Sequence, residues 1–63
     1  MKRILVVGGG LIGSRHVHAV KAHSGCELVG LVDPDLSIQT VDPRFAAMAD
    51  VTDAVDGVIL ATP

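Results

Sequence analysis

The feature that most constrains this chain is a glycine-rich segment placed directly after its first apolar run. Arg3–Val7 is dominated by β-branched residues and reads as a strand, and the next six residues, Gly8 to Gly13, fit the pattern G-x-G-x-x-G. In such a segment the first glycine permits a tight turn, the second lets a pyrophosphate approach the backbone, and the third lets the following helix pack closely on the strand. We therefore expect a phosphate-binding turn here, with a purely structural turn as the alternative.

A helix and a second strand are expected after this turn. From Leu11 to about Ser24 the apolar residues recur at helical spacing without an interrupting proline, and Gly25 supplies a stop. Glu27–Val32 is a second strand, which Pro34 prevents from continuing. A strand, a helix and a strand in this order form a βαβ unit, whose two strands are parallel.

The rest of the chain extends the same alternation. We expect a helix beginning within residues 35–40, a short strand at Arg44–Phe45, a helix at Ala46–Val55 on Ala-rich propensity, and a strand at Gly57–Ala61. The predicted fold class is α/β, a Rossmann-type parallel sheet (the first β-α-β-α-β-α-β half), which is incomplete. Because the sequence ends on a buried-type strand, we expect residues 1–63 to be the amino-terminal part of a dinucleotide-binding domain, with the substrate domain outside this chain.

An acidic residue supports a nucleotide role for the glycine turn. Asp33 stands 20 residues after Gly13, at the end of the second strand, where a carboxylate accepts hydrogen bonds from the adenosine ribose hydroxyls. A carboxylate at this place repels a 2′-phosphate, and the residues that directly follow it include no basic residue, so NAD is favoured over NADP. Asp33 could also cap a helix.

Composition excludes several other classes. The net charge of −2 and a single aromatic residue, Phe45, give no reason to expect nucleic acid as a partner. No apolar run approaches the roughly 20 residues that span a bilayer, so no membrane association is expected and the cytoplasm is the default location. The three histidines lie in or at the end of the first helix without converging on one point, and no metal site is expected.

Several reactive residue types are read as structural. His16 is expected to pack near the sheet, with a role near the cofactor as the alternative, and Arg15 is read as a solvated charge. Cys26 has no activating neighbour in the sequence and is read as a small filler. The acidic residues at 50, 53 and 56 are read as the solvated face of a helix.

Three segments together resemble the Gfo/Idh/MocA oxidoreductases, the family of glucose–fructose oxidoreductase and inositol 2-dehydrogenase. They are Val6–His16, with its G-x-x-H continuation, Leu31–Asp35, and Asp56–Pro63, which ends in Ala-Thr-Pro. The resemblance implies a two-domain NAD(P)-dependent enzyme that transfers hydride between a nicotinamide and a sugar, inositol or similar polyol. In one respect the chain departs from the family, because only residues 36–42 separate Asp35 from Pro43, where members place a full helix. Either this helix is shortened or residues are missing at that point.

The resemblance also assigns roles to individual residues. The glycine turn would line the pyrophosphate, Asp33 would hold the ribose, and the end of the fourth strand would border the cofactor; the cofactor-binding residues are therefore expected to be Gly8, Gly10, Leu11, Ile12, Gly13, Asp33, Ala61, Thr62 and Pro63. The family's catalytic lysine and histidine would fall after Pro63, so the catalytic residues stay unknown. The expected partner is a small sugar or polyol substrate, and we expect a homo-oligomer.

Two further functions use the same turn. A non-catalytic NAD(H)-binding regulatory or sensor domain needs the same glycines and the same Asp33, so these residues do not separate it from an enzyme. An S-adenosylmethionine methyltransferase also has a glycine-rich turn and an acidic residue after its second strand. The spacing of the three glycines and the Ala-Thr-Pro end argue against that last reading.

Overall fold

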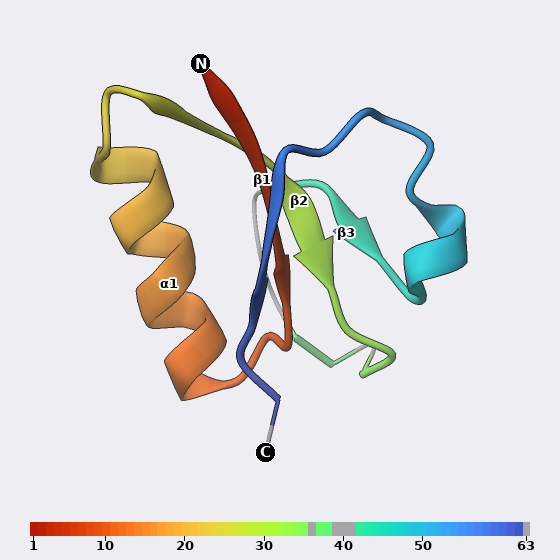
Figure 1. Cartoon of the computed structure of the whole chain (residues 1–63). Coiled ribbons are helices and arrows are strands. Elements are labelled where there is room, and N and C mark those ends of the chain that lie inside the picture. The colour runs from red at the N-terminus through yellow and green to blue at the C-terminus, as the bar shows by residue number, and fades with distance from the viewer. Residues whose placement is uncertain (36, 39–41, 63) are drawn as a thin grey trace.

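The computed structural model describes residues 1–35, 37–38 and 42–62. Its elements, in chain order, are the strand β1 (Lys2–Val7), the helix α1 (Leu11–Ala22), the strands β2 (Cys26–Val32) and β3 (Arg44–Phe45), the single 3-10 turn η1 (Met48–Asp50), and the strand β4 (Gly57–Leu60) (Figure 1). The four predicted strands and the first predicted helix are confirmed, with ends that differ from the prediction by one or two residues.

The four strands form one parallel sheet in the order β3-β2-β1-β4. The chain moves outward from β1 to β2 to β3, and then returns to the other side of β1 to form β4. This reversal places a topological switch between β1 and β4, and ligands of open α/β sheets bind at the carboxyl ends of the strands beside such a switch. The parallel sheet and this strand order confirm the predicted Rossmann-type α/β fold.

The strands β1 and β2 pair in parallel along their whole length, with one shift in register. Ile4 lies opposite Leu28, but the next residue, Leu5, lies opposite Gly30, so β2 carries one extra residue at Val29. A Cβ added to Gly30 would come within 2.7 Å of the Phe45 ring, which explains why glycine stands at this point beside β3. The extra residue lets β2 pair with β1 up to Val32, directly before Asp33.

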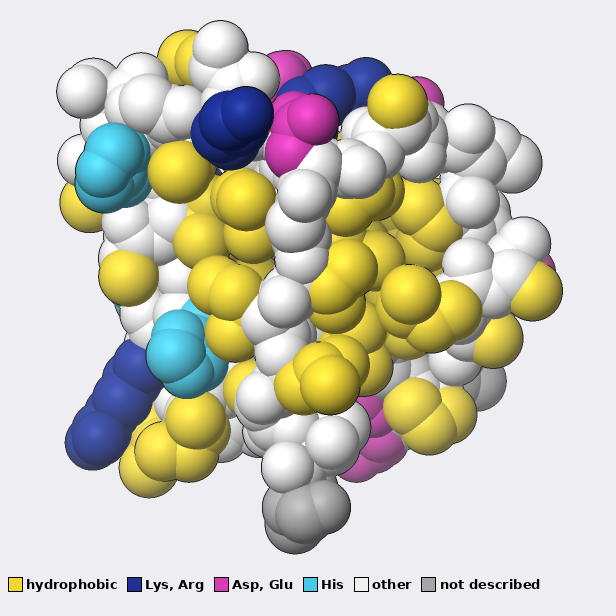
Figure 2. All heavy atoms as spheres, viewed as in Figure 1, with side chains coloured by type: hydrophobic (Ala, Val, Ile, Leu, Met, Phe, Trp, Pro, Cys, Tyr) yellow, Lys and Arg dark blue, Asp and Glu magenta, His cyan; other side chains and the backbone are white. Residues whose placement is uncertain are grey.

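The two faces of the sheet are covered differently. The helix α1 packs against β1 and β2 on one face, and the segment containing η1 lies on the other side of the sheet (Figure 1). The buried cluster of Leu5, Val29 and Val32 is covered in part by Val51 and Val55 from this segment. Near β4 the covering is thinner: Val58 and Leu60 are exposed, and Figure 2 shows hydrophobic side chains on both sides of the β4 backbone.

The prediction of a helix at Ala46–Val55 is wrong, because that segment forms only the 3-10 turn Met48–Asp50. The Asp50 carboxylate accepts the Ala47 N–H at 3.2 Å, and Val51 adopts extended backbone angles directly after the turn. The bond to Ala47 caps the start of this single turn, but short helices are marginal in water even with alanine, and Val51 and Val55 pack against the core of the sheet. The acidic residues at 50, 53 and 56 are exposed, as expected, but they do not form one face of a helix.

The helix expected within residues 35–40 falls in part on Leu36, Gln39 and Thr40, which lie outside the described residues.

Candidate cofactor-binding site

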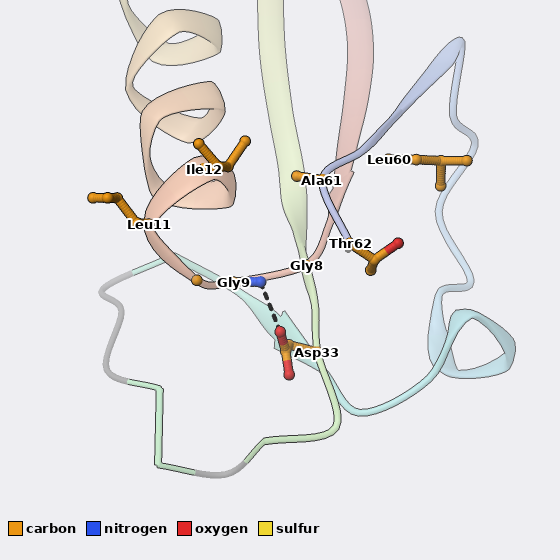
Figure 3. Close-up of a pocket in the computed structure, with 9 residues that line it drawn as sticks. Gly8, Gly9, Leu11, Ile12, Asp33, Leu60, Ala61 and Thr62 are labelled. Atoms are coloured by element: carbon orange, nitrogen blue, oxygen red, sulfur yellow. Dashed lines mark hydrogen bonds between the residues drawn. The ribbon is translucent and has the colours of Figure 1, made fainter.

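A pocket of about 440 Å³ opens at the carboxyl edge of the sheet, within the range of pockets that hold small molecules. It receives residues from the ends of β1, β2 and β4 and from the start of α1 (Figure 3), and it is lined by Gly8, Gly9, Gly10, Leu11, Ile12, Asp33, Leu60, Ala61 and Thr62. These segments are far apart in the sequence, and the parallel sheet brings them together beside the switch between β1 and β4.

The turn begins at Gly8, where the backbone conformation itself requires glycine. Its φ is +104°, a region that side chains disfavour, and an added Cβ would lie 2.9 Å from the carbonyl carbon of Ala61. Two backbone hydrogen bonds of 2.8 Å fix the surroundings, from Gly8 N to Val32 O and from Ala61 N to Val7 O. The first glycine therefore brings the end of β1 close to the chain that leaves β4.

Gly10 and Gly13 differ in the space around them, because the backbone leaves room for a side chain at Gly10 and none at Gly13. A Cβ added to Gly10 would meet no atom within 4 Å, and Gly10 is exposed at the pocket. A Cβ added to Gly13 would overlap the carbonyl group of Gly8, and Gly13 is buried. Gly13 therefore lies behind the turn, where the sequence pattern expected it to let the helix pack closely, and it does not line the pocket, although the family resemblance counted it among the residues at the pyrophosphate.

The start of α1 presents backbone donors beside the pocket. Gly10 is the residue that precedes the helix, and no side chain caps this end. Within the described part of the chain, the N–H groups of Leu11, Ile12 and Gly13 have no hydrogen-bond partner, as is usual for the first turn of a helix. Unpaired N–H groups and the positive end of the helix dipole attract an anionic group such as a pyrophosphate.

Asp33 closes the site from the end of β2. Its Oδ2 accepts the Gly9 N–H at 2.7 Å, shown as the dashed line in Figure 3, and its Oδ1 accepts the Asp35 N–H at 2.8 Å. The Asp33 backbone N–H donates to Phe45 O at 2.9 Å, which ties this position to β3. Asp33 is half-buried and is the one charged side chain among the described residues that line the pocket.

The structure brings most of the predicted site residues together and adds two. Besides Gly13, Pro63 is not among the lining residues, since it lies outside the described residues. The additions are Gly9, whose N–H bonds to Asp33, and Leu60, the last residue of β4. Gly9 occupies a variable position of the G-x-G pattern, and Leu60 looked like any buried strand residue. In the structure Leu60 is 74% exposed, more than Val58 at 45% on the same strand.

The other reactive side chains lie away from the pocket. His16 and Cys26 are half-buried, whereas His18 and His23 are exposed, and none of the four lines the pocket. No three His, Cys, Asp or Glu side chains come together to hold a metal ion in the part of the chain that the structure describes. Among those same residues, no helix is long and apolar enough to cross a membrane.

Comparison with known proteins agrees with this geometry. The family model of an oxidoreductase family with an NAD-binding Rossmann fold, GFO_IDH_MocA, matches residues 2–63. Searches of curated proteins and of solved structures gave no match. The family match covers almost the whole chain, and it includes the glycine turn, Asp33 and the end of β4. The chain therefore belongs to the Gfo/Idh/MocA oxidoreductase family and forms part of its NAD-binding Rossmann domain.

Proposed function

We propose that the pocket holds NAD(H) for hydride transfer between its nicotinamide and a secondary alcohol of a sugar, inositol or similar polyol. The observation that carries the proposal is the joint placement of the glycine turn, the start of α1 and Asp33 around one pocket. The pyrophosphate would meet the backbone at Gly10 and the first N–H groups of α1, because no Cβ would stand in its way there. When bound, the nicotinamide supplies the hydride chemistry.

The choice of NAD over NADP follows from the charge at the end of β2. The Asp33 carboxylate would accept the ribose hydroxyls and would repel a 2′-phosphate. No lysine or arginine is among the described residues that line the pocket. The charge of Arg44 helps to lower the pKa of the neighbouring Asp35, but Arg44 does not line the pocket.

The proposal for the substrate rests on the family, and the catalytic residues are not among the residues that line the pocket. We propose a sugar or polyol substrate because of the family to which the chain belongs. No side chain at the pocket is suited to move the alcohol proton, since Asp33 is the only ionisable group among its described lining residues and is bonded to backbone. We therefore assign to this chain the binding and orientation of the cofactor, and we place the acid–base step on residues outside it.

Titration of the full-length protein with NADH and NADPH tests this proposal. We expect NADH to bind more tightly, and Asp33→Arg to shift the preference toward NADPH, because the substitution replaces a repulsive charge with an attractive one. Asp35→Asn is the matched control, since it removes a neighbouring carboxylate that does not line the pocket. Absence of NADH binding by the wild-type protein, or a ratio unchanged by Asp33→Arg, would contradict the assignment.

The substrate is tested separately by incubating the protein with NAD and a panel of sugars and inositols. We expect reduction of NAD, read as the appearance of NADH absorbance, with at least one cyclic polyol or aldose. Binding of NADH without turnover of any alcohol would instead favour a regulatory or sensor domain.

A further inference from the structure

We propose that Asp33 is a positioning residue of the glycine turn, holding Gly9 through its backbone N–H, as well as an acceptor of ribose hydroxyls. The hydrogen bond from Gly9 N to Asp33 Oδ2 is 2.7 Å long and joins residues 24 positions apart. Both partners belong to this chain, so the bond needs no group from a nucleotide.

The turn needs such a restraint because it contains three consecutive glycines. Glycine loses more conformational freedom on folding than any other residue, so Gly8 to Gly10 is costly to order. Gly8 is restrained by its bond to Val32 O, and Gly10 precedes the helix, whose Ser14 N–H bonds to Gly10 O. Gly9 lies between these two anchors, and among the described residues its N–H has one partner, the Asp33 carboxylate.

The other oxygen of Asp33 makes this restraint rigid. Because Oδ1 accepts the Asp35 N–H at 2.8 Å, the carboxylate cannot rotate freely about its side-chain bond. The packing around Gly9 is also close, since an added Cβ would come within 2.8 Å of the Ile38 side chain. Asp33 therefore holds the middle of the turn in one place and aims the following N–H groups at the pocket.

Positioning of the turn by Asp33 and recognition of the ribose by Asp33 predict different affinities for a nucleotide that lacks the ribose hydroxyls. If Asp33 served only as an acceptor for ribose hydroxyls, a nucleotide without these hydroxyls would be indifferent to its hydrogen-bonding capacity. If Asp33 orders the turn, that same nucleotide depends on the Gly9 bond through its phosphates. This part of the inference rests on the proposed NAD function, since it requires phosphates to bind at the turn.

The experiment compares Asp33→Asn with Asp33→Ala in the full-length protein, using ADP and 2′,3′-dideoxy-ADP as probes. Both variants lose the negative charge, so they change its repulsion of the phosphates equally. They differ because asparagine keeps an oxygen that can accept the Gly9 N–H, whereas alanine does not. We expect the alanine variant to bind dideoxy-ADP about three- to tenfold more weakly than the asparagine variant, as loss of one neutral hydrogen bond implies. Equal affinities of the two variants for dideoxy-ADP would overturn the proposal.

A second measurement follows the turn without any ligand. Amide hydrogen exchange at Gly9, followed by NMR in the nucleotide-free protein, should be about tenfold or more faster in Asp33→Ala than in the wild type. Asp33→Asn should stay closer to the wild type. Asp35→Ala is the matched control, because the Asp35 carboxylate bonds to Ser37 and not to the turn. Unchanged exchange at Gly9 in Asp33→Ala would refute the positioning role.

The two measurements separate this inference from the proposed function. If the wild-type protein binds neither ADP nor NADH, the cofactor assignment fails, while hydrogen exchange at Gly9 still decides whether Asp33 holds the turn. If NADH binds and Gly9 exchange is unaffected by Asp33→Ala, the cofactor assignment stands and the positioning role fails. Melting temperatures of both variants check that each one is folded.

Discussion

At the residue scale, glycine stands at the three positions of the G-x-G-x-x-G pattern for three different physical reasons. Gly8 is required by its positive φ, and Gly13 by the carbonyl of Gly8 that lies against it. Gly10 has neither constraint, because its φ of −72° suits any residue and open space surrounds it. Folding therefore explains two of the glycines, whereas the third is accounted for by the proposed approach of a ligand to the backbone.

This difference predicts that Gly10→Val weakens nucleotide binding and leaves the fold intact. The valine side chain would occupy the open space at the turn, so we expect loss of detectable NADH binding by calorimetry. The free energy of unfolding should change by less than about 1 kcal/mol, as at other exposed positions. Gly13→Ala is the contrasting variant: its Cβ would overlap backbone, and we expect a loss of about 1–3 kcal/mol or more. Unchanged NADH affinity in Gly10→Val would remove Gly10 from the site.

Asp35 gives a pH-dependent prediction at the same scale. The Ser37 hydroxyl and then the Ser37 backbone N–H bond to its carboxylate and lower its pKa below the ordinary value of 3.8, and the charge of Arg44 adds to this. A carboxylate with a lowered pKa stabilises the folded state above the pKa of the unfolded chain, and this contribution is lost as the pH falls through the lower folded value. The turn at Ser37 should therefore be insensitive to pH near neutrality and weaken only below about pH 4.

Carboxyl titration by NMR checks this expectation. Ser37→Ala removes the hydroxyl donor and keeps the backbone one, so the pKa of Asp35 should rise toward its ordinary value without reaching it. A pKa of Asp35 that is the same in both proteins would show that the hydroxyl does not carry the effect.

At the element scale, the connections are less regular than the strands they join. The crossover from β1 to β2 is a full helix, whereas the crossover from β3 to β4 contains only η1 and extended chain. Lys21 near the end of α1 forms an ion pair of 3.0 Å with Asp42, which joins the helix to the segment before β3. Side-chain anchors of this kind hold the connections where helical hydrogen bonding does not.

One such anchor joins the start of β4 to β1 and gives a prediction. Asp56 Oδ2 accepts the Arg3 N–H at 2.7 Å, and the Asp56 N–H donates to Arg3 O at 2.8 Å. Asp56→Ala removes the first of these bonds, and we expect it to lower the free energy of unfolding in urea by about 1 kcal/mol, since the site is exposed. Asp53→Ala is the control, because that exposed carboxylate has no hydrogen bond within residues 1–35, 37–38 and 42–62. Equal stability of both variants would show that the bond does not anchor β4.

At the scale of the whole molecule, a small buried core supports the sheet. Among the residues that the structure describes, Leu5 and Val6 are the two large side chains that are essentially fully buried. They stand at adjacent positions of the strand β1 and hence on opposite faces of the sheet. The central strand therefore contributes to the packing on both sides, against α1 on one face and against the segment that includes Val51 and Val55 on the other.

We predict that Leu5→Ala lowers the stability of the whole sheet and, with it, nucleotide binding. Truncating a buried leucine costs about 2–5 kcal/mol, a large part of the stability of a small domain. Val58→Ala, at a position that is 45% exposed on β4, should cost clearly less. Urea unfolding of the full-length variants, followed by circular dichroism, gives both values. Similar losses of unfolding free energy in Leu5→Ala and Val58→Ala would show that Leu5 is not part of the core.

The strands β1, β2 and β4, the helix α1 and the glycine turn could be predicted because their signals are local. Apolar runs, helical spacing and glycines act on residues that are neighbours in the chain. The helix expected at Ala46–Val55 was predicted on the same local basis and is wrong, because the packing of Val51 and Val55 against the core prevails over alanine propensity. Two lining residues, Gly9 and Leu60, were missed, since their place depends on residues distant in the sequence.

What the sequence by itself determined is the phosphate-type turn, the acidic residue after β2 and, through the pattern as a whole, the oxidoreductase family. Only the tertiary structure decided that β4 lies beside β1, that Leu60 lines the pocket, and that the Asp33 carboxylate bonds to Gly9. The reason is physical. Local conformation follows from side chains within a few positions, whereas strand order and the geometry of the pocket arise when distant segments share one core and one set of hydrogen bonds.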